Sequence, residues 1–239
     1  METSEIQTVG STVALDYRTA AVFQKYGIDF CCKGGLSIAE ACQRKGVNKT
    51  ILLDELETVT QGADAKSDNF NSWELDKLVD YIVNKHHAYI SEQVPILLQF
   101  LNKLCKVHGE RHPELFAINE EFNYVAEELT MHMKKEELIL FPAIKSMVNA
   151  ARTNQPSTTP PFGSVQNPIA MMMHEHEIEG NRFVKIEKLT SAYTPPADGC
   201  TTYRVAFQML KDFQVDLHKH IHLENNILFP KAAELETVH

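Results

Sequence analysis

HMKKEELILFP (residues 132–142) and HIHLENNILFP (residues 220–230) are two copies of one pattern, H-x-x-x-E-x-x-I-L-F-P, placed 88 residues apart. In each copy a histidine precedes a glutamate by four residues. On an α-helix this spacing puts both side chains on one face, with β-carbons roughly 5–6 Å apart. An imidazole and a carboxylate so placed can bind one metal ion, and the carboxylate can also bridge two. The repeat therefore predicts two helices that each carry a pair of metal ligands.

Both pairs lie on apolar helix faces, so their carboxylates are expected to be buried. The residues that share these faces are Val125, Leu129, Ile139 and Leu140 in the first copy and Phe213, Leu217, Ile227 and Leu228 in the second. An unpaired carboxylate is costly to bury, and a bound cation offsets that cost. A His–Glu salt bridge or a solvated helix face explains a single copy equally well. Two copies on core-facing stripes favour metal binding.

The repeat belongs to a larger set of helical patterns. Apolar residues recur at helical spacing over residues 72–107, 113–149, 165–192 and 200–235, and alternating strand patterns are absent. Turn-rich or proline-rich segments separate the four patterns. Four amphipathic helices with short to medium connections predict an all-α fold, an antiparallel four-helix bundle.

The first and third helices offer further imidazoles. His176 shares its face with apolar residues and is favoured over His174, whose face is polar, whereas His87 is favoured over His86 only narrowly. Together with the repeat this gives four histidines and two glutamates that point into one core. Two glutamates bridging two metal ions, each with two histidines, is the arrangement that this set suggests. Imidazole and carboxylate ligands suit iron, manganese and zinc, and the spacing does not choose among them.

The N-terminal segment forms a separate feature. Residues 1–60 read as short helices that form a small domain, and residues 61–72 read as a polar linker. Within this domain Cys31 and Cys32 are adjacent, with α-carbons about 3.8 Å apart across a trans peptide. A disulfide between them would be strained, so two free thiols are expected.

Composition excludes several classes of protein. The chain has 239 residues and a formal net charge of −9, which disfavours binding to nucleic acid. No apolar run approaches the roughly 20 residues that span a membrane. The N-terminus lacks the basic start and apolar core of a secretory signal. We therefore expect a cytoplasmic protein that acts neither on membranes nor on nucleic acids.

Several short motifs give the chain a family resemblance. Residues 73–235 resemble the hemerythrin-like di-iron bundles, and the added segment DFCCKGG (residues 29–35) resembles the iron–sulfur cluster repair proteins, the RIC or YtfE/ScdA/DnrN family. Further anchors are EQVP (residues 92–95), EEL (residues 127–129) and LENNILFP (residues 223–230). By position, the resemblance places the ligands of two iron ions on His87, His132, Glu136, His176, His220 and Glu224. Both glutamates resemble the family's bridging carboxylates.

The resemblance also implies roles for nearby residues. Cys31 and Cys32 would be redox or iron-handling thiols, and His108 would support the site from behind its ligands. Glu128 and Glu175 could do the same or line an exit path for iron, although a solvated helix surface explains both. The remaining pair, His218 and His222, flanks His220 on another helix face and is expected to be exposed.

The implied function is cytoplasmic repair of iron–sulfur clusters damaged by oxidative or nitrosative stress, with iron supplied to the damaged protein. The alternatives are an enzyme that binds or reduces nitric oxide at the same site, and a hemerythrin-like sensor of oxygen or iron. Expected partners are iron–sulfur proteins with damaged clusters, with nitric oxide or dioxygen as ligand. The sequence leaves open the catalytic residues, the electron donor and the oligomeric state, a homodimer included.

Overall fold

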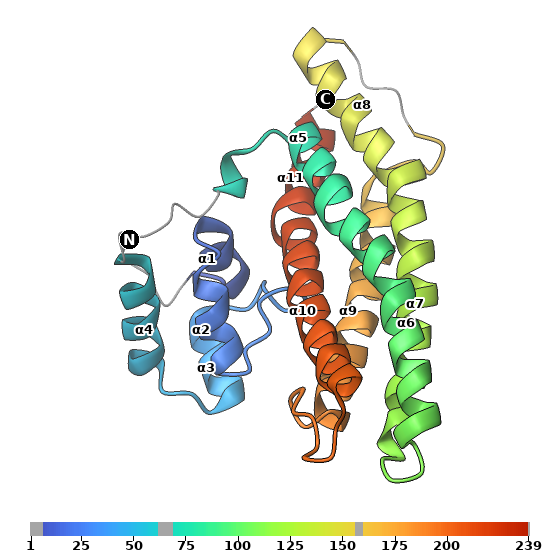
Figure 1. Cartoon of the computed structure of the whole chain (residues 1–239). Coiled ribbons are helices and arrows are strands. Elements are labelled where there is room, and N and C mark those ends of the chain that lie inside the picture. The colour runs from blue at the N-terminus through green and yellow to red at the C-terminus, as the bar shows by residue number, and fades with distance from the viewer. Residues whose placement is uncertain (1–6, 62–68, 156–159, 239) are drawn as a thin grey trace. The chain divides into compact units, whose positions relative to one another are not determined.

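The computed structural model describes residues 7–61, 69–155 and 160–238. These residues form helices joined by turns, and the described part of the chain contains no β-strand (Figure 1). Its only β-type pairing is the isolated bridge between Thr8 and Ser37. The all-α prediction is therefore confirmed.

The chain divides into two compact units, which we call the bundle unit and the terminal unit. The bundle unit comprises Asp80–Ser146 and Thr158–His218. The terminal unit comprises Met1–Val79, Met147–Ser157 and Lys219–His239. The division passes through the continuous helices α5 (Leu75–Tyr81), α8 (Phe141–Thr153) and α10 (Thr201–Leu223).

The four predicted long helices are present with ends within a few residues of those expected. The first consists of α5, η2 (Ile82–His87) and α6 (Ala88–His108), and the second of α7 (Glu114–Lys135), η3 (Glu136–Leu140) and α8. The third is the single helix α9 (Gln166–Leu189). The fourth consists of α10, η4 (Glu224–Leu228) and α11 (Phe229–Val238). The segments η2, η3 and η4 are single π-helical turns inserted into otherwise α-helical rods.

One ring joins the helices of the bundle unit. Phe213 on α10 is fully buried, and its ring lies 6.2 Å from Tyr89 on α6, 5.5 Å from Phe122 on α7 and 5.7 Å from Phe183 on α9, between centroids. In Figure 1 these helices run side by side, as a four-helix bundle requires. The aromatic contacts fix which helix faces turn inward, and the candidate ligands lie on those faces.

The terminal unit contains four short helices from the start of the chain: α1 (Val9–Leu15), α2 (Thr19–Lys25), α3 (Ile38–Lys45) and α4 (Lys49–Gln61). Their core includes Val9, Phe23, Ile38, Leu52 and Leu56, all with no exposed surface. A capping box begins α3, because the Ser37 hydroxyl accepts the Glu40 N–H while the Glu40 carboxylate accepts the Ser37 N–H.

Residues 62–68, most of the predicted linker, lie outside the described residues. The end of that stretch, Phe70–Ser72, is a short 3₁₀ helix, η1. None of the helices in the described ranges is both long and apolar enough to cross a bilayer.

Candidate metal centre

Three π-helical turns coincide with candidate ligands. His87 is the last residue of η2, and Glu136 and Glu224 are the first residues of η3 and η4. In η3 the N–H of Phe141 donates to the carbonyl of Glu136, and in η4 the N–H of Phe229 donates to that of Glu224, both five residues back. Such turns are rare and concentrate at functional sites.

Prolines give a local reason for two of these turns. Pro142 and Pro230 follow the glutamates by six residues in the two copies of the repeat. A proline has no N–H to donate, and its ring crowds the carbonyl four residues earlier. Widening the preceding turn to π geometry relieves that crowding without ending the helix. The motif ILFP was therefore the sequence signal for these two π-turns. The sequence analysis missed it because it assumed regular α-helices.

The structure corrects one expectation about burial. Ile139 was placed on the face of His132 and Glu136, but its side chain is 49% exposed, while Leu140 is buried. In the second copy, which has the same π-turn, Ile227 is buried as expected. There α1 packs against η4, so the two copies differ in what covers them rather than in the turn itself.

Three histidines converge on Glu136 within the bundle unit. His87 Nε2 lies 3.3 Å from Glu136 Oε2, and His132 Nε2 lies 3.4 Å from Glu136 Oε1. His176 Nε2 lies 3.0 Å from His132 Nε2. All four side chains are buried, and Glu136 has no exposed surface.

The opposite ring nitrogens of two of these histidines have carboxylate partners. His87 Nδ1 lies 2.7 Å from Glu137 Oε1, and His132 Nδ1 lies 2.9 Å from Glu175 Oε2. An imidazole that donates its Nδ1–H to a carboxylate presents the Nε2 lone pair, as metal-binding histidines do. The hydrogen bond from His132, with help from Lys135, lowers the pKa of Glu175 to about 2. Glu137 was not predicted, although it directly follows a proposed ligand.

The second copy of the repeat forms a closed pair in the terminal unit. His220 Nε2 lies 2.9 Å from Glu224 Oε1, and neither side chain has exposed surface. The pair uses the i, i+4 spacing that the repeat predicts.

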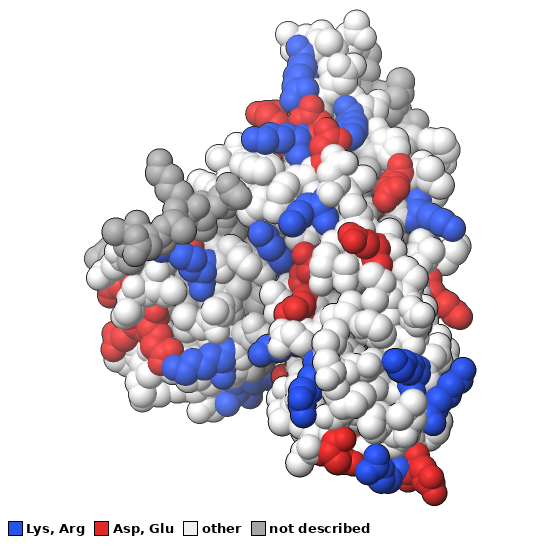
Figure 2. Space-filling model, in the orientation of Figure 1, with Lys and Arg blue, Asp and Glu red and all other residues white. Residues whose placement is uncertain are grey.

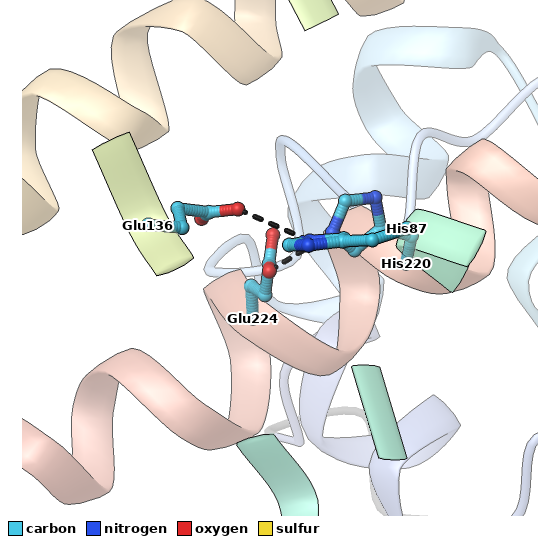
Figure 3. A group of neighbouring side chains, drawn as sticks. All are labelled: His87, Glu136, His220 and Glu224. Carbon is cyan, nitrogen blue, oxygen red and sulfur yellow. Dashed lines mark hydrogen bonds and ion pairs between the residues drawn. The ribbon is translucent and has the colours of Figure 1, made fainter. Parts of the chain in front are cut away.

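Potential metal ligands gather within each unit. In the bundle unit the ligand atoms of His132, Glu136 and His176 all lie within 4.8 Å of one another, and His87 contacts the same glutamate. In the terminal unit His220 and Glu224 form the second cluster. Figure 3 shows the side chains of His87, Glu136, His220 and Glu224. This donor set fits a metal ion, because the carboxylates are fully desolvated and the neighbouring imidazoles present lone pairs.

The competing histidines lie elsewhere. His86 is buried, but its Nδ1 lies 3.0 Å from both carboxylate oxygens of Asp216. His174 is exposed. His108 is buried with its Nε2 3.2 Å from Cys200 Sγ, and Glu128 is exposed. Of the supporting residues suggested by sequence, the structure therefore brings only Glu175 to a ligand.

Two asparagines that directly follow Glu224 hold the loop of residues 29–35, which we call the cysteine loop, within the terminal unit. Asn226 Nδ2 donates to the carbonyls of Phe30 (3.3 Å) and Cys31 (3.1 Å), and Asn225 Nδ2 also donates to that of Cys31 (3.3 Å). A β-carbon on Gly34 would lie 2.2 Å from Asn226 Oδ1, and one on Gly10 would lie 2.1 Å from the same atom. Glycine at these two positions therefore permits the close approach.

The two thiols differ in environment. Cys31 is buried and Cys32 is partly exposed, and neither forms a disulfide. The hydrogen bond with Cys32, together with burial, raises the pKa of the Cys31 thiol well above its ordinary value. Cys31 is thus a neutral thiol at physiological pH.

The expectation that His222 is exposed was wrong. Its side chain is 1% exposed and packs against the rings of Phe30 and Tyr17, each with centroids 5.9 Å away. Burial lowers its pKa to about 4, so it is neutral. The cysteine loop covers the helix face that sequence alone leaves open to solvent.

Comparison with known families agrees with this architecture. Residues 78–232 match the model described as hemerythrin HHE cation binding domain, and residues 5–60 match ScdA_N, a domain of unknown function (DUF542). The chain belongs to the hemerythrin HHE family. Its bundle is a hemerythrin-type helical bundle, and the buried histidine and glutamate clusters of that bundle fit a metal site.

Curated relatives of this hemerythrin-family chain extend over nearly its whole length. The iron–sulfur cluster repair protein ScdA of Staphylococcus haemolyticus is 30% identical over 90% of this chain and 92% of its own. Proteins named YtfE, with the same description, are 31% identical in Yersinia pestis (96% of this chain, 98% of the relative) and 32% identical in Musicola paradisiaca (92% of each). The chain therefore belongs with the ScdA and YtfE proteins.

Proposed function

We propose that this chain binds two iron ions in its bundle and supplies iron to iron–sulfur clusters damaged by oxidative or nitrosative stress. The ligands would be His87 and His220 for one ion and His132 and His176 for the other, with Glu136 and Glu224 bridging. The observation that carries the proposal is that three histidines gather around the buried carboxylate of Glu136, while the second copy of the repeat holds His220 against the buried carboxylate of Glu224.

Charge supports two divalent ions. Glu136 and Glu224 are fully buried, and Glu137 and Glu175 contact the outer nitrogens of two ligand histidines. Together these four carboxylates carry four negative charges, which two divalent cations would balance. Lys135 forms an ion pair with Glu175 and offsets part of the charge of that carboxylate.

The ligand set suits a donor of iron. Nitrogen-rich ligation holds iron less tightly than a carboxylate-rich cage, and iron, once bound, would supply open coordination positions for a small ligand. The chain's own groups orient the imidazoles, through Glu137 and Glu175, and exclude water from the bridging carboxylates. The choice of iron over zinc or manganese draws on the names of the ScdA and YtfE relatives.

The test is restoration of a damaged iron–sulfur dehydratase. Iron-loaded protein should restore activity to a dehydratase inactivated by peroxide or nitric oxide, in the presence of a chelator that blocks repair by the same amount of free iron. Glu136→Ala should fail, and Glu128→Ala, which changes an exposed glutamate about two turns earlier on the same helix, should act like the wild type. Equal repair by Glu136→Ala would contradict the proposal.

Nitric oxide reduction is a second candidate function. Reduction of two nitric oxide molecules to nitrous oxide and water consumes two electrons and two protons, which is what two thiols release when they form a disulfide. Cys31 and Cys32 are two such thiols, with sulfurs 3.8 Å apart, although a disulfide between these neighbours would be strained. Steady consumption of nitric oxide in the presence of a reductant would support an enzyme, whereas consumption that stops at stoichiometric binding would favour iron supply alone.

The proposed partners are proteins with damaged iron–sulfur clusters rather than nucleic acids. On the face shown in Figure 2 acidic and basic side chains are interspersed, without a continuous basic stripe. The overall charge of −9 opposes phosphate backbones. The cytoplasm, as a reducing compartment, is the location in which the free thiols would persist.

A further inference from the structure

The cysteine loop of the terminal unit gathers three potential ligands of its own. The ligand atoms of Asp29, Cys31 and Cys32 lie within 4.8 Å of one another. Cys31 Sγ lies 3.3 Å from Asp29 Oδ1 and 3.8 Å from Cys32 Sγ. None of the six bundle ligands takes part in this group.

The separation of the two sulfurs matches a shared metal ion. Two thiolates bound at about 2.3 Å to one tetrahedral ion lie about 3.8 Å apart. A disulfide would need them to approach to about 2.05 Å, and adjacent cysteines across a trans peptide meet that geometry only with strain.

The backbone of the loop is fixed before any ion binds. Asp29 Oδ1 accepts the N–H groups of Cys31 (3.1 Å) and Cys32 (2.9 Å), which leaves the second carboxylate oxygen for a ligand. From the other side Asn226 holds the carbonyls of Phe30 and Cys31. Ligands held in place by neighbouring hydrogen bonds lose little freedom on binding.

We propose that Asp29, Cys31 and Cys32 form a second, mononuclear site for a thiophilic divalent cation such as Fe²⁺, Co²⁺ or Zn²⁺. The inference deepens the iron-handling role proposed above by giving the thiols a third ligand and a site of their own. Binding breaks two S–H bonds and forms two metal–sulfur bonds, the two protons pass to solvent, and nothing is oxidised or reduced. Three protein ligands leave a tetrahedral ion one open position, as in sites that exchange ligands. Asp29 and Cys32 are partly exposed, which gives the ion access from solvent.

Cobalt provides the test, because only thiolate ligands give a sulfur-to-cobalt charge-transfer band in the near ultraviolet. Co²⁺ is titrated into the full-length, reduced protein without oxygen. We expect a band that saturates with one cobalt ion per chain and that disappears in the Cys31→Ser/Cys32→Ser double variant. Asp29→Asn keeps an oxygen that can accept the two N–H groups, so it should keep the loop but weaken cobalt binding by about tenfold or more.

Control variants separate this site from others in the chain. Cys200→Ser removes the thiol beside His108 and should leave the band unchanged. Glu136→Ala disables the bundle site and should also keep the band, so failure of one proposal is distinguishable from failure of the other. Helical circular dichroism confirms that each variant is folded. Absence of the band from folded wild type, or its persistence in the double cysteine variant, would overturn the proposal.

Discussion

Two glutamates outside the ligand set orient the imidazoles of the bundle site. Glu137 and Glu175 accept from the Nδ1 atoms of His87 and His132, so the Nε2 lone pairs face the buried carboxylate of Glu136. The same contacts raise the basicity of both imidazoles.

Changing Glu137 to glutamine should therefore weaken metal binding without removing a ligand. The amide oxygen can still accept the His87 proton, but its negative charge is lost. We expect metal affinity to fall by about 10- to 100-fold, measured by competition with a chelator of known affinity. Glu128→Gln is the matched control, and equal affinities of the two variants would contradict the role given to Glu137.

Glu179 shows the free-energy cost of burying a carboxyl group whose oxygens have no hydrogen-bond partner. Its side chain is 3% exposed, with Arg182 Nε 3.7 Å away, and burial raises its pKa to about 8. Between the ordinary glutamate pKa and this value the unfolded chain is ionised while the folded chain is protonated. Folding then requires proton uptake, so this group destabilises the fold increasingly as pH rises toward 8.

Glu179→Gln should remove that pH dependence. The stability gain of the variant over wild type should grow between pH 5 and pH 8, by up to about 1.4 kcal/mol per pH unit. Urea unfolding at several pH values measures it, with both proteins in the same state of metal loading. Glu177→Gln, an exposed neighbour, should show no such trend, and a gain for Glu179→Gln that is constant with pH would refute the explanation.

At the scale of elements, the π-turns and the cysteine loop are where the sequence reading was incomplete. Helical periodicity predicted the four rods because each buries a continuous apolar face. It assumed 3.6 residues per turn throughout, so it missed the π-turns that begin at Glu136 and Glu224. It placed Ile139 on a buried face, although of the two equivalent isoleucines only Ile227 is buried. It also left His222 exposed, because periodicity within one helix carries no information about the loop that covers it.

The close packing of that loop predicts different effects for two adjacent glycines. A β-carbon at Gly34 would lie 2.2 Å from Asn226 Oδ1 and 2.7 Å from the Phe30 carbonyl, whereas one at Gly35 has nothing within 4 Å. Gly34→Ala should cost about 1–3 kcal/mol of stability and open the loop. Alkylation of Cys31, which is 4% exposed, should then be faster.

Gly35→Ala serves as the matched control for this experiment. Its melting temperature and its rate of Cys31 alkylation should equal those of the wild type. If Gly34→Ala also behaves like the wild type in both measurements, the Asn226 contact does not hold the loop.

At the scale of the whole molecule, most of what could be predicted about the fold and the site came from the H-x-x-x-E-x-x-I-L-F-P repeat. It indicated the bundle, the inward faces and the ligand types, because buried polar residues at i, i+4 are expensive unless they bind something. The supporting carboxylates Glu137 and Glu175 were harder to predict. They lie at the edge of the apolar stripe, where a solvated glutamate has the same sequence pattern.

The central claim is that two ions share Glu136 and Glu224, and metal content per chain tests it most directly. Wild type, Glu136→Ala and the control Glu128→Ala are purified without oxygen and analysed by mass spectrometry. We predict about two iron ions per chain in the wild type and the control and a clear loss in Glu136→Ala. Stoichiometric zinc or no metal in the wild type, or undiminished iron in Glu136→Ala, would contradict the account.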